Sequence, residues 1–155
     1  MKPIHLAYIV AQRVRVWWRR TFQIRTRGVK AVVLRGDSVL LIRHSYQSPD
    51  TYMLPGGGID RRERAMEAGA REVREETGCI LTDMREHGQF VATSEGWPDH
   101  ITVVVGQTTS APVADGKELL EARFFPLNAL PANLSPASLR GVKEVRDGLP
   151  PADAW

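Results

Sequence analysis

The sequence of 155 residues lacks most of the features that mark membrane, secreted or disordered proteins. A single cysteine excludes an internal disulfide and fits a reducing compartment, so we expect a cytoplasmic protein. No apolar run approaches the ~20 residues that a membrane-spanning helix needs. The first apolar stretch, LAYIVA, is too short for a signal peptide and no cleavage-like site follows it. With 43% hydrophobic and 25% charged residues, the composition is that of a folded chain with one domain.

Acidic residues are absent from the start of the chain. Residues 1–30 contain eight Lys or Arg and no Asp or Glu, whereas residues 31–155 contain 13 basic and 18 acidic side chains. The positive net charge of +3 therefore comes from a basic arm, and the remainder of the chain is mildly acidic. This asymmetry argues against a domain that binds nucleic acid as a whole. We predict a basic amphipathic arm over residues 1–24 and a folded domain over residues 25–150.

The arm has an apolar stripe near helical spacing with arginines between its members. The apolar residues are Leu6, Ile9, Val10, Val14 and Trp17. Such a stripe needs a partner, which is the protein's own sheet, a second subunit in a homodimer, or an anionic membrane surface. Packing on the protein or on a dimer mate is the commoner outcome, and we expect it here. A targeting segment would have a similar composition.

The rest of the chain alternates between strand and helix patterns. Strands are predicted over residues 29–34, 39–44, 85–93, 101–108 and 122–126, with a turn at Arg35-Gly36-Asp37. Helices are predicted over residues 65–77, ended by Gly78, and from Pro136 to Gly148, with Ser135 as N-cap. MLPGGG is expected to be a tight loop rather than a strand. This alternation predicts an α/β or α+β domain with a mixed sheet.

The helix over residues 65–77 concentrates negative charge. Glu72, Glu75 and Glu76 lie close together, and like charges at this spacing destabilise a helix. On a helical wheel they cluster roughly 140° from an apolar stripe that we expect to face the core. That stripe consists of Met66, Ala70, Val73 and Thr77. Three carboxylates beside the small residues Ala65, Ala68 and Gly69 suit a hard divalent cation, although the spacing alone would also fit a solvated acidic face.

The segment from Gly57 to Cys79 resembles the signature box of the Nudix hydrolases. The matching residues are Gly57, Glu63, Arg71, Glu72, Val73, Glu75, Glu76 and Gly78. A chance match of the seven fixed identities is on the order of one in 10⁸. The preceding hairpin, LPGGG and the later EARFFPLNALP extend the resemblance over roughly residues 27–147. Cys79 stands where an aliphatic residue is usual, and we interpret it as a core substitution rather than a metal ligand.

The resemblance implies a fold and an activity. The fold would be an α/β/α sandwich with a mixed β-sheet, in which the box forms a loop-helix-loop. The activity would be Mg²⁺- or Mn²⁺-dependent hydrolysis of a phosphoanhydride bond in a nucleoside diphosphate derivative, a small-molecule partner. Carried onto this chain, Glu72, Glu75 and Glu76 would be catalytic metal ligands, joined by the carbonyl of Gly57. The structural residues of the box would be Glu63, Arg71 and Gly78.

Further candidate residues lie outside the box. Glu118 is the expected catalytic base, with Glu121 as the near alternative, and either could instead be a surface carboxylate. Arg43 and His44, at the end of a predicted strand, are candidates for substrate contacts. Trp97 is a further candidate for stacking on a base, and a loop anchor is the alternative role.

The substrate within the class stays open. The proline typical of ADP-ribose enzymes is replaced by Ser94, and the tyrosine typical of dinucleoside polyphosphate enzymes is missing. No cysteine cluster suggests a zinc ribbon, and the coenzyme A motif is absent. Deoxynucleoside or nucleoside triphosphates, nucleotide sugars and ADP-ribose all remain. A catalytically silent nucleotide-binding or regulatory module is the alternative function, which the intact box disfavours. An allylic diphosphate isomerase would need a catalytic cysteine outside the box.

Overall fold

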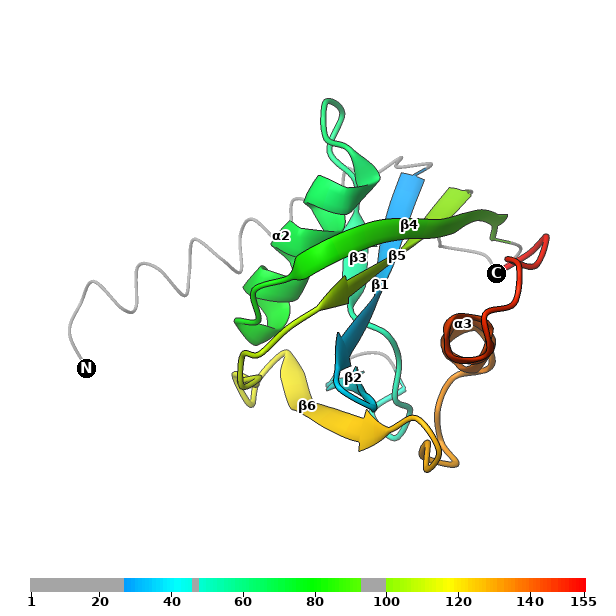
Figure 1. Cartoon of the computed structure of the whole chain (residues 1–155). Helices are drawn as coiled ribbons and strands as arrows, with labels where there is room; N and C mark the ends of the chain where they lie inside the picture. The colour runs from blue at the N-terminus through cyan, green and yellow to red at the C-terminus, as the bar shows by residue number, and fades with distance from the viewer. Residues whose placement is uncertain (1–26, 46–47, 93–99) are drawn as a thin grey trace.

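The computed structural model describes residues 27–45, 48–92 and 100–155, which form strands and helices in the order shown in Figure 1. The predicted amphipathic arm and Trp97 lie outside these residues. The elements are β1 (Arg27–Arg35), β2 (Ser38–His44), β3 (Gly56–Gly58), α2 (Ala65–Thr77), β4 (Thr82–Val91), β5 (His100–Gln107), β6 (Leu119–Pro126) and α3 (Pro136–Asp147). None of the helices in the described ranges is long and apolar enough to cross a membrane.

The strands form one mixed sheet, as predicted. Its order is β4-β5-β1-β2-β6, and β3 pairs with β1 off this path. The pairing of β1 with β5 is parallel, and the other pairings are antiparallel. The hairpin between β1 and β2 turns at Gly36, whose φ of 58° lies in the left-handed region that glycine tolerates.

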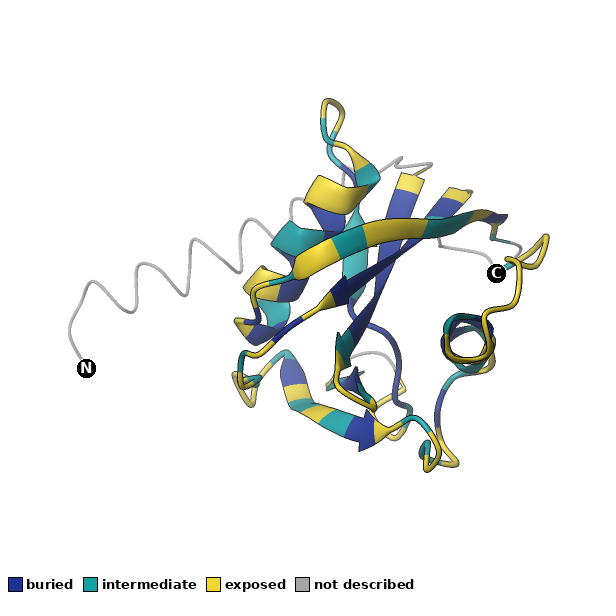
Figure 2. Cartoon of the chain, in the orientation of Figure 1, coloured by how far each residue is buried: buried dark blue, intermediate teal, exposed yellow. Residues whose placement is uncertain are grey.

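The two helices cover opposite faces of this sheet, which confirms the α/β/α sandwich (Figure 1). Alternate residues of β1 serve the two faces because successive strand side chains point to opposite sides. Ala31 and Val33 pack toward α2, with Val73 and Cys79, whereas Val32 packs toward α3. The strands β1, β2 and β5 are buried along most of their length (Figure 2).

Both helices have the predicted bounds and caps. In α2 the backbone N–H of Arg64 donates to Glu67 Oε2 at 3.3 Å, and Gly78 ends the helix with φ 76°. In α3 the hydroxyl of Ser135 accepts from the N–H of Ser138, and Pro136 occupies the first turn. The local capping chemistry therefore determines both helix ends.

The prediction for Gly56–Gly58 was wrong, because this segment forms a short strand rather than a loop. It pairs with β1 in the register Val29 to Gly57. A side chain at Gly56 would collide with the carbonyl oxygen of Val29, so only glycine allows this approach. Strand β4 also begins earlier than predicted, at Thr82, and carries irregularities that break the clean alternation of a regular strand.

The predicted core face of α2 was partly wrong. Met66 is 39% exposed and Ala70 is half-buried, whereas the buried residues of the helix are Ala68, Gly69, Glu72, Val73 and Thr77. The helix approaches the sheet closely at Gly69, where a Cβ would lie 2.6 Å from Val104 Cγ2. Small residues thus make the closest contact between α2 and the sheet. The helix is therefore rotated about its axis relative to the predicted orientation, and Glu72 faces the sheet.

Candidate metal and substrate site

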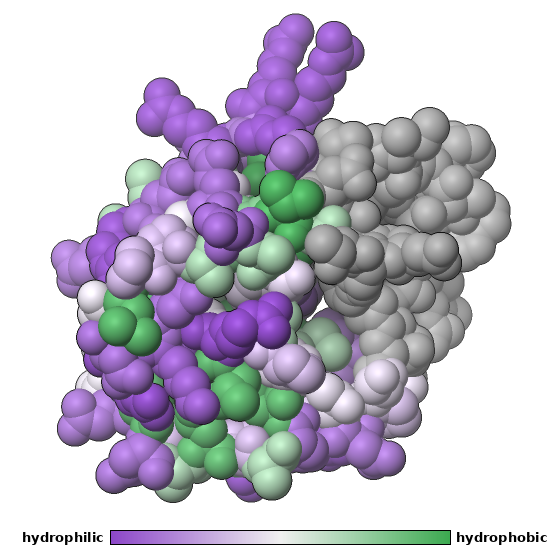
Figure 3. Space-filling model, turned by 90° about the vertical axis from the view of Figure 1, so that its right-hand side faces the viewer, coloured by the Kyte–Doolittle hydropathy of each residue, from purple (hydrophilic) through white to green (hydrophobic). Residues whose placement is uncertain are grey.

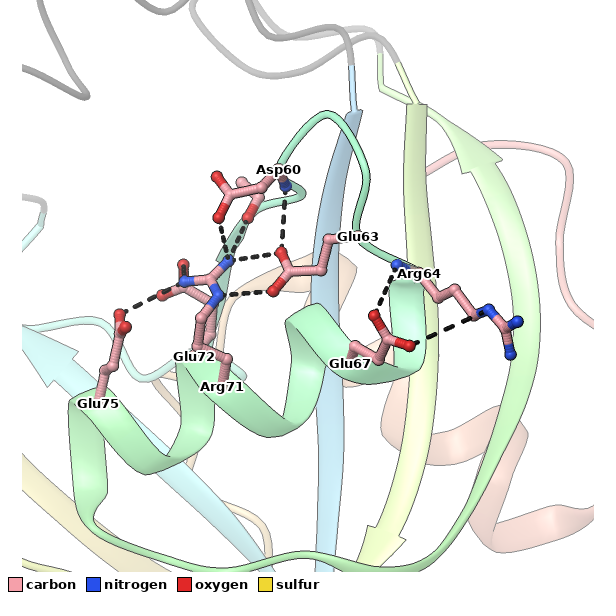
Figure 4. Close-up of polar contacts among 8 residues, drawn as sticks. Asp60, Glu63, Arg64, Glu67, Arg71, Glu72 and Glu75 are labelled. Atoms are coloured by element: carbon pink, nitrogen blue, oxygen red, sulfur yellow. Dashed lines mark hydrogen bonds and ion pairs between the residues drawn. The ribbon is translucent and has the colours of Figure 1, made fainter.

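An ion pair between Arg71 and Glu63 joins α2 to the loop before it. Arg71 Nε donates to Glu63 Oε2 at 2.8 Å, and Arg71 Nη2 donates to Glu63 Oε1 at 2.8 Å (Figure 4). The same Nη2 donates to the carbonyl of Gly58 at 3.0 Å, and Asp60 lies 3.8 Å away. These bonds, led by the one from Glu63, raise the pKa of Arg71. The guanidinium therefore fixes the loop on the helix at two points.

Glu72 lies at the centre of the site, between Arg71 and Gly57. Its side chain is buried, with the residue 8% exposed, and its Oε1 accepts from Arg71 Nη1 at 2.8 Å. A Cβ on Gly57 would lie 2.5 Å from Glu72 Cδ and 2.7 Å from both carboxylate oxygens. The predicted contribution of Gly57 thus has a steric counterpart, since glycine is what lets the β3 backbone approach the carboxylate.

Glu75 binds Arg71 as well. Its Oε2 accepts from Arg71 Nη1 at 3.4 Å, one helical turn along (Figure 4). Because one nitrogen serves both Glu72 and Glu75, these carboxylates turn toward the guanidinium. Accordingly, within the described ranges no group of three or more acidic, His or Cys side chains is arranged to hold a metal ion. Charge repulsion from both Glu72 and Glu75 acts on Glu76, and the role of these three residues as metal ligands stays a prediction.

Glu76 projects from α2 toward Lys30 and β3. Its Oε2 is buried and has no hydrogen-bond partner among the described residues, while the carboxyl group accepts from the backbone of Gly56. Burial, reinforced by repulsion from Glu72, raises the pKa of Glu76 to about 8. A buried oxygen without a hydrogen bond is costly, so this atom is the clearest candidate for a cation ligand.

Lys30 is a site residue that was not predicted from the sequence. It lies on β1, is 9% exposed, and donates from Nζ to the carbonyl of Leu54 at 3.3 Å. Burial lowers its pKa, against the attraction of Glu76 and Glu72. A charged residue inside the apolar run VKAVVL is the sequence signal that could have revealed it, because lysine is rarely buried without a partner.

Arg43 lies in a network apart from the carboxylates of α2. Its Nε and Nη2 donate to Glu121 Oε2 at 3.0 and 2.9 Å, and the hydroxyl of Tyr52 donates to the same oxygen at 2.8 Å. Burial alone would raise the pKa of Glu121, but the bonds from Tyr52 and Arg43 outweigh it and lower the pKa. Glu121 is thus held as an ionised partner of Arg43, which makes it a poor proton acceptor.

Glu118 and His44 lie where β2 meets the start of β6, since His44 pairs with Leu119. Glu118 lies in the turn before β6, where its carbonyl accepts from the N–H of Ser45 at 3.0 Å. His44 ends β2 and is buried. No hydrogen bond or ion pair within residues 27–45, 48–92 and 100–155 joins the Glu118 side chain to Glu72, Glu75 or Glu76. The role of Glu118 as base therefore stays a prediction.

Cys79 is fully buried in the core on the α2 side, next to residues of β1 and β5. This position agrees with a core substitution.

A comparison with protein families decides the relationship of this chain. The profile of the NUDIX domain matches residues 24–145. The chain belongs to the Nudix hydrolase family. The matched range includes every strand and helix from β1 to most of α3.

The chain matches only part of the length of its curated relatives. The chain is 32% identical over 105 residues to the NAD-capped RNA hydrolase NudC of Stutzerimonas stutzeri, which is 65% of this chain and 36% of that protein. It is 31% identical over 103 residues to NudC of Escherichia coli strain K12, covering 64% of this chain and 38% of that protein. The chain therefore matches little more than a third of the length of these relatives.

Solved structures show the same fold. A MutT Nudix hydrolase from Burkholderia pseudomallei superposes with a TM-score of 0.65 at 23% identity, over 79% of this chain and 99% of that one. A UDP-X diphosphatase superposes with a TM-score of 0.58 at 20% identity, over 89% of this chain and 71% of that one. At these identities the likeness concerns the fold.

Proposed function

We propose that this Nudix domain hydrolyses a phosphoanhydride bond of a nucleoside diphosphate derivative with the help of Mg²⁺ or Mn²⁺. The observation that carries the proposal is the buried oxygen of Glu76, which lacks a hydrogen bond among the described residues and lies near the buried carboxylate of Glu72. Family membership supports the reaction class. The names of the relatives point the same way, since NAD and UDP-X both contain a nucleoside diphosphate.

The donor set fits a hard divalent cation. Glu72, Glu75 and Glu76 offer carboxylate oxygens, and β3 brings the backbone of Gly57 against Glu72. The thiol of Cys79 is enclosed in the apolar core and is not part of this set. Glu76 and Glu72 would hold the cation from the sheet side. Glu75 would join them by turning its carboxylate away from Arg71. Arg71 would then keep its bonds to Glu63.

When bound, the cation would neutralise charge on the diphosphate and lower the pKa of the attacking water. The residues of the chain supply the rest. Arg71 and Glu63 hold the loop so that Gly57 stays against Glu72, which fixes the ligands relative to β3. Lys30 places its amino group beside Glu76 and Glu72, on the side of β1. Glu118 remains the proposed proton acceptor.

The test is a panel of nucleoside diphosphate derivatives incubated with Mg²⁺ and, separately, with Mn²⁺. The panel contains deoxynucleoside triphosphates, ADP-ribose, NADH, a UDP-sugar and an RNA with a 5′ NAD cap. Release of phosphate, pyrophosphate or nucleoside monophosphate is followed. We expect metal-dependent release from at least one small molecule. If none is cleaved with either metal, the chain is a binding module without catalysis.

A second measurement tests the metal without requiring turnover. Divalent cations that bind the native protein raise its melting temperature by mass action. We expect the melting temperature to rise with Mg²⁺ or Mn²⁺ in the native chain, and not in the Glu75→Gln, Glu76→Gln double variant. An equal rise in both proteins would place cation binding elsewhere.

A further inference from the structure

A pocket of about 300 Å³ opens between β1, the chain after β2, the start of α3 and the segment of residues 151–155. Its lining includes one aromatic ring, one thioether and two basic side chains, which are Trp155, Met53, Lys30 and Arg140. The side of the molecule that carries α3 and this segment is mostly hydrophilic, with separate hydrophobic patches (Figure 3). A pocket with an aromatic wall on such a face suits a small ligand rather than a large apolar partner.

The indole of Trp155 is held in place by contacts on several sides. Its backbone N–H donates to the carbonyl of Val91 at 3.0 Å, and its ring meets Phe90 edge-on with centroids 5.5 Å apart. The ring also abuts α3, because a Cβ on Gly141 would lie 3.3 Å from its Cζ3. A ring fixed before binding loses little conformational entropy when a ligand stacks on it.

The segment that carries Trp155 is anchored independently of the ring. The N–H of Ala152 donates to Glu144 Oε2 at 3.2 Å, and the other oxygen of Glu144 pairs with His87 Nε2 at 2.9 Å. Pro151 lies against Gly88, where a Cβ would be 2.5 Å from the proline ring. These contacts fix the segment of residues 151–155 as one wall of the pocket.

Lys30 connects this pocket to the carboxylates of α2. The same side chain lines the pocket and is attracted by Glu76 and Glu72. A ligand in the pocket would therefore lie on one side of Lys30, with the carboxylates on the other. A nucleotide has this division of parts, since an aromatic base is joined through a sugar to its phosphates.

We propose that this pocket binds the base of the nucleotide substrate, stacked on the indole of Trp155, with Arg140 donating hydrogen bonds at the rim. This inference rests on the proposed function and specifies its substrate-binding part. Arg140 is exposed and forms no ion pair within the described part of the chain, so its donors are available. Stacking increases with ring area, so purine nucleotides bind more tightly than pyrimidine nucleotides.

The experiment titrates AMP, GMP, UMP and CMP into the whole chain in the presence of a chelator, with affinity measured by calorimetry. Trp155→Ala is expected to weaken purine binding by about tenfold or more, and Trp155→Phe by only a few-fold. Arg140→Ala, at an exposed position, is expected to weaken it by a few-fold. Leu149→Ala is the matched control, because Leu149 is 51% exposed and does not line the pocket. It should leave affinity unchanged.

Trp155→Ala also removes a contact with Phe90, so a measurement on the native protein accompanies it. In an NMR titration with AMP, the indole N–H resonance of Trp155, assigned by its loss in Trp155→Phe, is expected to shift. No shift of this resonance, or pyrimidines binding as tightly as purines, would overturn the inference.

The two proposals fail in different ways. If the native chain hydrolyses a nucleotide and Trp155→Phe and Arg140→Ala leave KM and monophosphate affinity unchanged, the pocket assignment is wrong and the activity stands. If monophosphates bind as described but no substrate is cleaved with either metal, the pocket assignment stands and the proposed catalysis is wrong.

Discussion

The backbone of Gly57 lies so close to Glu72 that a Cβ there would come within 2.7 Å of both oxygens of the carboxylate. The Gly57→Ala variant must therefore displace Glu72 or separate β3 from β1. Because misplacing a metal ligand typically lowers activity 10–100-fold, we expect a loss of roughly that size. Steady-state hydrolysis and the rise in melting temperature with Mn²⁺ both measure it. Gly36→Ala is the control, since it strains a turn with φ 58° in open space and should keep the metal response.

Substitution of Glu75 or of Glu76 should lower turnover in both cases but should affect stability differently. Glu75→Gln and Glu76→Gln should each lower kcat on the order of 100-fold, as expected for ligands of a catalytic cation. Glu76→Gln should also change the stability of the metal-free protein, because its carboxyl is buried, whereas Glu75 lies nearer the surface. Glu86→Gln, on the exposed strand β4, is the control. Turnover near that of the native chain in either variant would remove that residue from the site.

The stability of the metal-free protein should decrease as pH rises from about 5 to about 8. Burial raises the pKa of Glu76 to about 8 in the folded chain, so in this range the folded state keeps a proton that the unfolded state has released. The contribution is complete at low pH and lost as pH passes the folded-state value. Urea unfolding at several pH values, with a chelator present, compares the native chain with Glu76→Gln. If the difference between the two proteins does not change with pH, the raised pKa is wrong.

Arg71→Ala should reduce both stability and activity. The guanidinium is largely buried and bonded to Glu63, Glu72 and the Gly58 carbonyl, so its removal leaves buried carboxylates uncompensated. Breaking a buried pair in this way costs about 3–5 kcal/mol. Chemical unfolding measures this loss. Arg71→Lys keeps the charge but cannot form the two parallel bonds to Glu63, so its stability should fall between those of the native chain and Arg71→Ala.

The sequence was most informative where local chemistry determines structure. The ends of α2 and α3 follow from Gly78, Ser135 and Pro136, and the apolar runs predict β1, β2 and β5. The strand Gly56–Gly58 could not be read in the same way, because its glycines fit a loop and a close strand pairing equally well. Only the position of β1 decides between them.

The candidate site was predicted in composition rather than in arrangement. The box places Glu72, Glu75 and Glu76 on one helix, but which face meets the sheet depends on how closely Gly69 approaches Val104. That approach turns Glu72 inward and leaves Met66 at the surface. Lys30 and Trp155 are far from the box in sequence, and the fold brings Lys30 to its carboxylates. Such contacts arise from the topology and have no local signal.

The bonds from Arg71 to both Gly58 and Glu63 have a consequence for how this region can vary in length. Surface loops usually accept inserted or deleted residues, since their ends stay in place. Here a single side chain of fixed reach spans the loop from its first residues to its last, at 3.0 Å from Gly58 and 2.8 Å from Glu63. A longer or shorter loop keeps both bonds only if it presents the Gly58 carbonyl and the Glu63 carboxylate at the same separation. One arginine that bonds to both ends of this loop therefore constrains the shapes that the loop can take.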